Sequence, residues 1–181
     1  MSKNVLVLTG SPRRGGNSDL LADALIKGAQ AAGHTVTKYT TADKRIAGCR
    51  ACRGCYTMGR ACVIDDDFNA LAPLVEQADV LVFATPLYWF SVPAQLKAAI
   101  DRFYALDNTG RLAHIRESVL LACAATTDMP DFDGLVRAYQ NLCGYKKWTD
   151  RGVLLAPGVE EKGDVAKTDL PARAEALGAA L

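Results

Sequence analysis

The chain has 181 residues, of which 50% are hydrophobic and 23% are charged, and its formal net charge is +1. This composition is typical of one globular domain that can bury its own core, so we expect residues 1–181 to form a single domain. The near balance of charge and the lack of a basic tract argue against a nucleic-acid partner, and no apolar run is long enough to span a membrane.

Short apolar runs alternate along the chain with segments whose apolar residues recur every three to four positions. The first run, residues 5–8, is too short for a signal peptide, which favours a cytoplasmic location, and it indicates a strand buried on both faces. In chain order we then expect a helix at 18–32, a strand at 35–40, a helix at 68–75, a strand at 79–85, a helix at 93–103, a strand at 119–125, a helix at 132–143 closed by Gly144, a last strand that ends with residues 153–156, a polar linker at 157–167 and a helix at 170–181. This alternation predicts an α/β protein, a flavodoxin-like three-layer sandwich whose parallel sheet has the strand order 2-1-3-4-5.

The loop after the first strand, GSPRRGGNS at residues 10–18, has the composition of a phosphate site. It leads into a helix N-terminus, which attracts anions, and it combines short side-chain donors with glycines and two arginines. It matches neither the nucleotide P-loop nor the dinucleotide fingerprint. The alternative is a Gly/Ser turn with a helix cap.

The loop after the third strand, which begins TPLYWF at residue 85, carries three consecutive aromatic residues. Ligands of such sheets bind beyond the carboxyl ends of the strands, so these aromatics are expected to flank a flat ring. The alternative is that they cover the sheet end or a subunit interface. A phosphate at one end and a flat ring at the other describe flavin mononucleotide (FMN).

These two loops, GSPRRGGNS and TPLYWFSVPAQLKAAIDR, resemble those of the NADPH-dependent FMN reductases and flavodoxin-like NAD(P)H oxidoreductases, over residues 1–127. The resemblance implies that FMN phosphate is held by Ser11, Arg13, Asn17 and Ser18. It implies that the flavin ring lies beside Pro86, Leu87, Tyr88 and Trp89, with Thr126 and Thr127 near the ribityl chain. It also implies a homodimer or homotetramer.

Four of the six cysteines fall in a C-x2-C-x2-C-x6-C pattern, within a loop insertion at residues 45–66. With the following Asp65-Asp-Asp-Phe68, this stretch resembles the iron–sulfur flavoproteins, and the spacing suits a four-iron, four-sulfur cluster. The candidate metal ligands are Cys49, Cys52, Cys55 and Cys62, and the interleaved arginines are expected to lower the thiol pKa values. A bare loop of buried thiols, a disulfide and a zinc site are the alternatives.

Other candidate groups are assigned structural roles. Cys123 and Cys143 are expected in the core, and His34 and His114 at the surface. The acidic run 65–67 is expected to cap the next helix.

The sequence thus predicts an FMN-dependent oxidoreductase with flavin-centred chemistry and no catalytic side chain. Electrons would come from NAD(P)H, or from ferredoxin if the cluster is present, and pass to a quinone, a flavin or another small acceptor. The alternatives are a non-enzymatic flavodoxin-type electron carrier, which the near-neutral charge disfavours, and a thiol or zinc redox sensor on the same scaffold.

Overall fold

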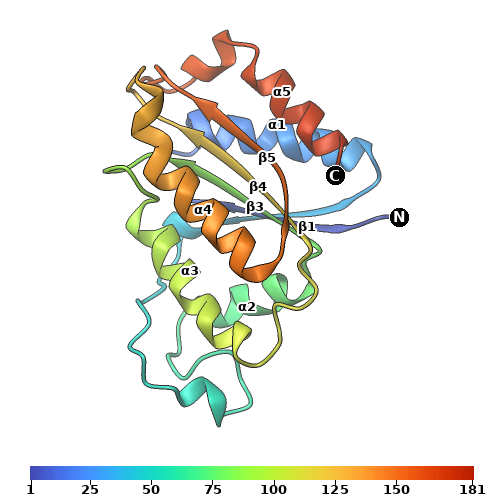
Figure 1. The fold of residues 1–181 in the computed structure, drawn as a ribbon, viewed down its shortest axis with the longest axis vertical. Coiled ribbons are helices and arrows are strands. Elements are labelled where there is room, and N and C mark those ends of the chain that lie inside the picture. The colour runs from blue at the N-terminus through green and yellow to red at the C-terminus, as the bar shows by residue number, and fades with distance from the viewer.

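Five parallel strands form one sheet in a computed structural model that describes residues 1–181. The strands are β1 (Asn4–Thr9), β2 (Thr35–Thr40), β3 (Val80–Pro86), β4 (Glu117–Cys123) and β5 (Thr149–Ala156). The helices are α1 (Asn17–Ala31), α2 (Phe68–Gln77), α3 (Ala94–Asp107), α4 (Asp133–Lys146) and α5 (Leu170–Ala179). The strand order is β2-β1-β3-β4-β5, which confirms the predicted flavodoxin-like topology (Figure 1).

The sheet separates two hydrophobic cores. Val7 of β1 and Val82 of β3 face α1 and α5, whereas their neighbours Leu8 and Phe83 face the side covered by α2, α3 and α4. Successive side chains of a strand point to opposite faces, so a strand covered on both faces needs a continuous apolar run. The central strands carry such runs, and this pattern made their positions predictable from the sequence.

The backbones of helices α1 and α5 touch at two glycines, one from each helix. A Cβ atom on Gly28 of α1 would lie 1.9 Å from the carbonyl oxygen of Glu175, and one on Gly178 of α5 would lie 2.0 Å from that of Leu25. No side chain fits at either position. The pair therefore sets how closely α5 approaches the rest of the domain.

Two expectations about local structure were wrong. Helix α4 does not close at Gly144 but continues to Lys146, where Lys147 adopts a left-handed conformation with φ of 55°. Strand β5 ends at Ala156, as expected, and begins at Thr149. The predicted linker 157–167 is packed structure, because Val159 and Val165 are buried in the core beside α1 and α5.

Both histidines were expected at the surface, and the structure separates them. His114 is exposed. His34 is partly buried and lies between the chain ends: its Nδ1 accepts a hydrogen bond from the backbone N–H of Lys3, and its Nε2 lies 3.1 Å from the carbonyl oxygen of Leu181. This ring has a structural role.

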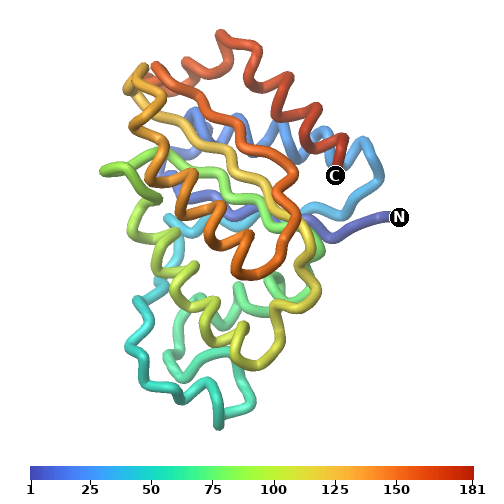
Figure 2. Tube along the Cα trace, in the orientation of Figure 1, coloured from blue at the N-terminus to red at the C-terminus, as the bar shows by residue number.

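Residues 45–66, here called the cysteine loop, project from the sheet at one end of the molecule, as the trace in Figure 2 shows. The loop lies between β2 and α2 in the chain, and its only helical turn covers Gly54–Tyr56. None of the helices of the structure combines the length and the apolar character that a membrane span requires.

Candidate functional site

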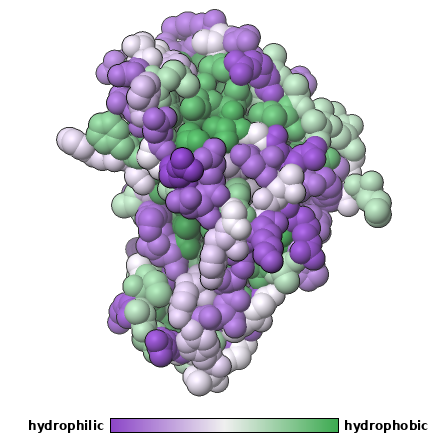
Figure 3. All heavy atoms as spheres, in the orientation of Figure 1, coloured by the Kyte–Doolittle hydropathy of each residue, from purple (hydrophilic) through white to green (hydrophobic).

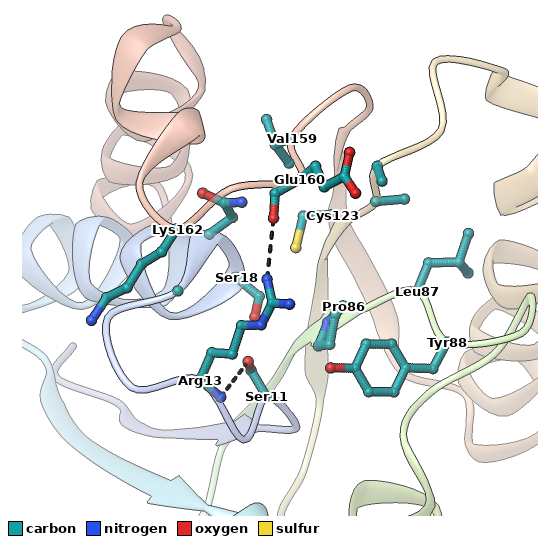
Figure 4. A pocket seen from close by; sticks show the side chains of 14 residues that line it. Ser11, Arg13, Ser18, Pro86, Leu87, Tyr88, Cys123, Val159, Glu160 and Lys162 are labelled. Atoms are coloured by element: carbon teal, nitrogen blue, oxygen red, sulfur yellow. Dashed lines mark hydrogen bonds between the residues drawn. The ribbon is translucent and has the colours of Figure 1, made fainter.

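A cavity of about 240 Å³ opens at the carboxyl ends of β1, β3 and β4, where the topology predicts a ligand site (Figure 4). Seven of the ten predicted cofactor residues line it: Ser11, Arg13, Asn17, Ser18, Pro86, Leu87 and Tyr88. The lining is completed by Gly16, Cys123, Ala124, Ala125, Val159, Glu160 and Lys162. The structure therefore brings the first two predicted loops together around one space.

The phosphate end of the cavity contains a buried hydroxyl with no partner. Ser18 is 1% exposed, and its Oγ makes no hydrogen bond. Ser11 is also buried, and its Oγ accepts a hydrogen bond from the backbone N–H of Arg13 at 3.1 Å. The N-cap position of α1, Gly16, offers no side chain to the free N–H groups of the first turn. An unpartnered buried hydroxyl is costly, so this end of the cavity fits an anionic ligand such as a phosphate.

Asn17 is bonded to the segment that follows β5. Its Nδ2 donates to the carbonyl oxygen of Glu161 at 2.9 Å, and its Oδ1 accepts from the backbone N–H groups of Gly163 and Val165 at 3.1 and 3.2 Å. Both ends of its amide are therefore engaged within the protein. In this structure Asn17 fixes the position of residues 161–165.

Arg13 also contacts this segment, because its Nη1 donates to the carbonyl oxygen of Glu160 at 3.1 Å (Figure 4). Val159, Glu160 and Lys162 thereby join the cavity wall, and sequence reasoning missed all three. The available signal was positional: residues 157–162 follow the carboxyl end of β5, at the same edge of the sheet as the other loops.

The ring end of the cavity is formed by the start of the β3–α3 loop. Pro86, Leu87 and Tyr88 line it, and the backbone N–H of Leu87 donates to the carbonyl oxygen of Cys123 at 2.7 Å. Trp89 does not line it. Trp89 and Phe90 form a two-residue turn with φ of 47° and 62°, and Trp89 is 93% exposed.

The β4–α4 loop contributes different residues from those predicted. Cys123, Ala124 and Ala125 line the cavity, whereas Thr126 and Thr127 do not. The Oγ1 of Thr126 accepts a hydrogen bond from the backbone N–H of Asp128 at 3.1 Å, which stabilises the loop itself.

Cys123 is buried as predicted, yet its side chain faces the cavity (Figure 4). Burial raises the pKa of this thiol to about 11, and the nearby Ser18 and Arg13 act in the opposite direction. The thiol is therefore protonated at neutral pH. It provides a neutral wall rather than a nucleophile.

The four cysteines of the cysteine loop line a second, much smaller cavity of about 20 Å³. This is roughly the space of one water molecule. All six cysteines of the chain are free thiols, and no three metal-binding side chains are placed to hold a metal ion. The structure thus places the predicted ligands around a common space without a closed metal geometry.

The expectation that neighbouring arginines lower the thiol pKa values does not hold for Cys55. Burial raises the pKa of this thiol, and the adjacent Cys62, Cys49 and Cys52 raise it further. Burial, the largest cause, and the neighbouring thiols therefore set the direction of the pKa shift at this position.

A buried ion pair joins the two ends of the cysteine loop. Arg102 of α3 is 1% exposed, and its Nη1 donates to the carbonyl oxygen of Ala47 at 2.8 Å and to Oδ2 of Asp66 at 3.0 Å. Its Nη2 donates to Oδ1 of Asp66 at 3.2 Å, and its guanidinium lies 4.6 Å from the ring centre of Phe68. Asp66 also makes the predicted capping contact, because its Oδ1 accepts a hydrogen bond from the backbone N–H of Phe68. Its carboxylate therefore both caps α2 and pairs with Arg102.

Comparisons with known proteins show which proteins this chain resembles. The chain is 39% identical over 95 residues to an iron–sulfur flavoprotein from Archaeoglobus fulgidus, a match covering 52% of this chain and 43% of that protein. It is 35% identical over 95 residues to an iron–sulfur flavoprotein from Methanosarcina thermophila, covering 52% and 49% of the two chains. The chain thus spans about half the length of these curated relatives.

Among solved structures, an NAD(P)H:quinone oxidoreductase from Methanothermobacter marburgensis has a TM-score of 0.73 at 20% identity, with 99% of this chain and 96% of that one covered. This likeness concerns the fold. The model of one family, described as NADPH-dependent FMN reductase, matches residues 3–128, which contain the first two cavity loops, the cysteine loop and strand β4. The chain therefore belongs to the NADPH-dependent FMN reductase family.

Proposed function

We propose that the chain binds FMN in the cavity at the carboxyl ends of the strands and acts as an NAD(P)H-dependent oxidoreductase on a quinone, a flavin or another small acceptor. The observation that carries this proposal is the unpartnered, buried Ser18 hydroxyl at the phosphate end of the cavity. FMN, when bound, supplies the electron transfer itself. The cytoplasmic location and the homodimer or homotetramer stay predictions.

The chain's own residues would bind and orient the cofactor. Ser11 and Ser18 would donate hydroxyl hydrogens to the phosphate, and Arg13 would turn from the carbonyl oxygen of Glu160 to add its charge. The backbone and side chains of Leu87 and Tyr88 would contact the ring, while Cys123 keeps that wall uncharged. Trp89, Thr126 and Thr127 would approach the cofactor only if their loops move.

We expect Arg13→Ala to weaken FMN binding about 10- to 100-fold, because a hydrogen bond to a charged group contributes about 1.5–3 kcal/mol. Riboflavin, which lacks the phosphate, should bind the variant as it binds the unchanged protein. Isothermal titration of both ligands measures the difference. Arg14→Ala is the matched control, because Arg14 is 82% exposed, pairs with Asp43 and does not line the cavity.

Two results would contradict this assignment. Equal losses for FMN and riboflavin would show a general disruption of the cavity, and an equal loss in Arg14→Ala would show a non-specific charge effect. Turnover of NADPH with a quinone by the FMN-loaded protein separates an enzyme from a non-enzymatic carrier, which would not turn over.

We further propose that the cysteine loop holds a four-iron, four-sulfur cluster. Four thiols on one cavity are the donor set that such a cluster needs, and the relatives at 39% and 35% identity are iron–sulfur flavoproteins. The cavity of about 20 Å³ would have to widen, and the exposed Cys49 and Cys52 are free to move outward. A bare loop and a thiol or zinc sensor are the competing states.

Purification without air should yield about four irons and four acid-labile sulfides per chain. Cys49→Ala, Cys52→Ala, Cys55→Ala and Cys62→Ala should each lose most of the iron. Cys143→Ala, a change at a buried thiol of α4 outside the loop, should keep it. Bound FMN without iron would contradict the cluster and leave the flavin proposal standing.

A further inference from the structure

The segment that follows β5 is fixed at both ends, although its composition is that of a linker. We call residues 159–165 the strap. Its first and last residues, Val159 and Val165, are buried and belong to the core that α1 and α5 cover. At the top of the view shared by Figures 1 and 3, where the chain passes from β5 to α5, the outer surface is mostly hydrophilic. The strap is therefore a surface segment whose two ends are anchored in the core.

Asn17 is the main link between the strap and the phosphate loop, residues 10–18. It is the first residue of α1, it is buried, and its amide makes the three hydrogen bonds to the strap backbone that are given above. These bonds reach the strap at residues 161, 163 and 165. The amide is therefore directed at the strap, and it fixes the strap over the N-terminus of α1.

Two further contacts close the same end of the cavity. The Nη1 of Arg13 donates to the carbonyl oxygen of Glu160 at 3.1 Å (Figure 4). The side chain of Lys162 lies against the phosphate loop, because a Cβ atom on Gly15 would lie 3.4 Å from its Cε and 3.5 Å from its Nζ. Lys162 forms no ion pair. The strap and the phosphate loop thus enclose the phosphate end between them.

An enclosed end distinguishes two classes of phosphate. A terminal phosphate monoester ends in three free oxygens, which donors can surround on every side. A phosphate diester, as in a flavin dinucleotide, continues into a second phosphate and a nucleoside, and these need an opening beyond the first phosphate. The contacts of Asn17, Arg13 and Lys162 keep the strap in the way of such an extension.

We propose that the strap makes the cavity selective for a flavin with a terminal phosphate over a flavin dinucleotide, and that Asn17 is the positioning residue that holds the strap. The inference rests on the proposed function and adds the segment that chooses between two cofactors. Selection against a competitor requires an obstacle as well as favourable contacts, and the fixed strap is that obstacle.

The test measures the dissociation constants of FMN and of flavin adenine dinucleotide (FAD) by isothermal titration, and hydrogen exchange of the strap by mass spectrometry without flavin. The unchanged protein should bind FMN about 100-fold or more tightly than FAD. Asn17→Ala should speed exchange in the strap and reduce this ratio about tenfold or more, because the strap can then move aside. Val165→Ala loosens the buried end of the strap without changing Asn17 and should shift both readouts in the same direction.

Asn69→Ala is the matched control. Asn69 of α2 is partly buried, its Nδ2 donates to the carbonyl oxygen of Ile64 at 3.0 Å, and it does not line the cavity. This variant also loses a side-chain hydrogen bond to the backbone, but far from the strap in the chain. It should keep the strap exchange and the FMN-to-FAD ratio of the unchanged protein.

Three results would overturn the inference and leave the proposed function intact. They are equal binding of FMN and FAD by the unchanged protein, an unchanged ratio in Asn17→Ala despite faster exchange, and a similar fall of the ratio in Asn69→Ala. If Asn17→Ala lost affinity for FMN alone, with riboflavin affinity and strap exchange unchanged, Asn17 would be a phosphate ligand and its positioning role would be wrong. Failure of the unchanged protein to bind FMN would overturn the proposed function, and the selectivity with it.

Discussion

Replacing Arg102 with methionine is expected to lower the free energy of unfolding by about 3–5 kcal/mol, because it leaves the nearly buried carboxylate of Asp66 without its partner. The guanidinium also donates to the carbonyl oxygen of Ala47 and lies over Phe68. Both ends of the cysteine loop lose their attachment to α3 in the same step. Urea denaturation followed by circular dichroism measures the loss.

Arg111→Met is the matched control for this prediction. Arg111 pairs with Glu76, but the two side chains are 31% and 30% exposed, so we expect a loss below about 1 kcal/mol. Similar losses in the two variants would show that burial does not determine the strength of the Arg102 pair. Arg102→Lys keeps the charge without the forked geometry and should fall between the two.

The same ion pair makes stability depend on acid. Burial alone would raise the pKa of Asp66, but hydrogen bonds from Arg102 and from the backbone N–H groups of Ala47 and Phe68 outweigh it, and the pKa is lowered on folding. A carboxyl whose folded pKa is depressed stabilises the protein above its unfolded value of about 3.9. That contribution is lost as the pH falls through the lower, folded value. The stability difference between the unchanged protein and Arg102→Met should therefore shrink below about pH 4.

The second large effect is expected at the contact between α1 and α5. Gly28→Ala should destabilise the fold by about 3 kcal/mol or more, since its methyl group would lie 1.9 Å from the carbonyl oxygen of Glu175 and a backbone cannot move aside as a side chain can. The two helices must separate to admit it. Thermal unfolding should show a clear drop in the midpoint temperature.

Gly144→Ala provides a control of opposite sign. Gly144 lies within α4, and a Cβ atom there meets nothing within 4 Å. Alanine favours a helix over glycine by about 0.8–1 kcal/mol, so this variant should gain stability. A loss at Gly144 comparable to that at Gly28 would mean that helix propensity, and not helix contact, governs both positions.

The fold was predictable because its strands are covered on both faces and carry continuous apolar runs, as in Val80–Ala84. Boundaries were less predictable where tertiary contacts decide them. Composition indicated a linker at residues 157–167, but the anchoring of Val165 and the three hydrogen bonds of Asn17 make this segment part of the domain. The helix after β4 passes Gly144 because a left-handed lysine, Lys147, ends it instead.

The site was predictable where sequence position determines placement, as for Ser11 and Ser18 beside the helix N-terminus. It was not predictable where the direction of a side chain depends on a turn. A run of three aromatics does not show that Trp89 and Phe90 occupy the two central positions of a tight turn, which directs Trp89 away from the cavity. Whether the four cysteines hold a metal depends on the path of the loop, which spacing alone does not determine.

The chain's two tryptophans occupy opposite environments, with consequences for optical work. Trp89 is 93% exposed, next in the chain to the cavity residue Tyr88, whereas Trp148 is 5% exposed and belongs to the hydrophobic core that α2, α3 and α4 cover. The indole of Trp89 should emit at long wavelength and be quenched by acrylamide, and that of Trp148 should do neither until the protein unfolds. The Trp148→Phe variant would therefore keep only Trp89, as a fluorescent reporter for ligand arrival at the cavity. The Trp89→Phe variant would keep only Trp148, as a reporter for the integrity of the core.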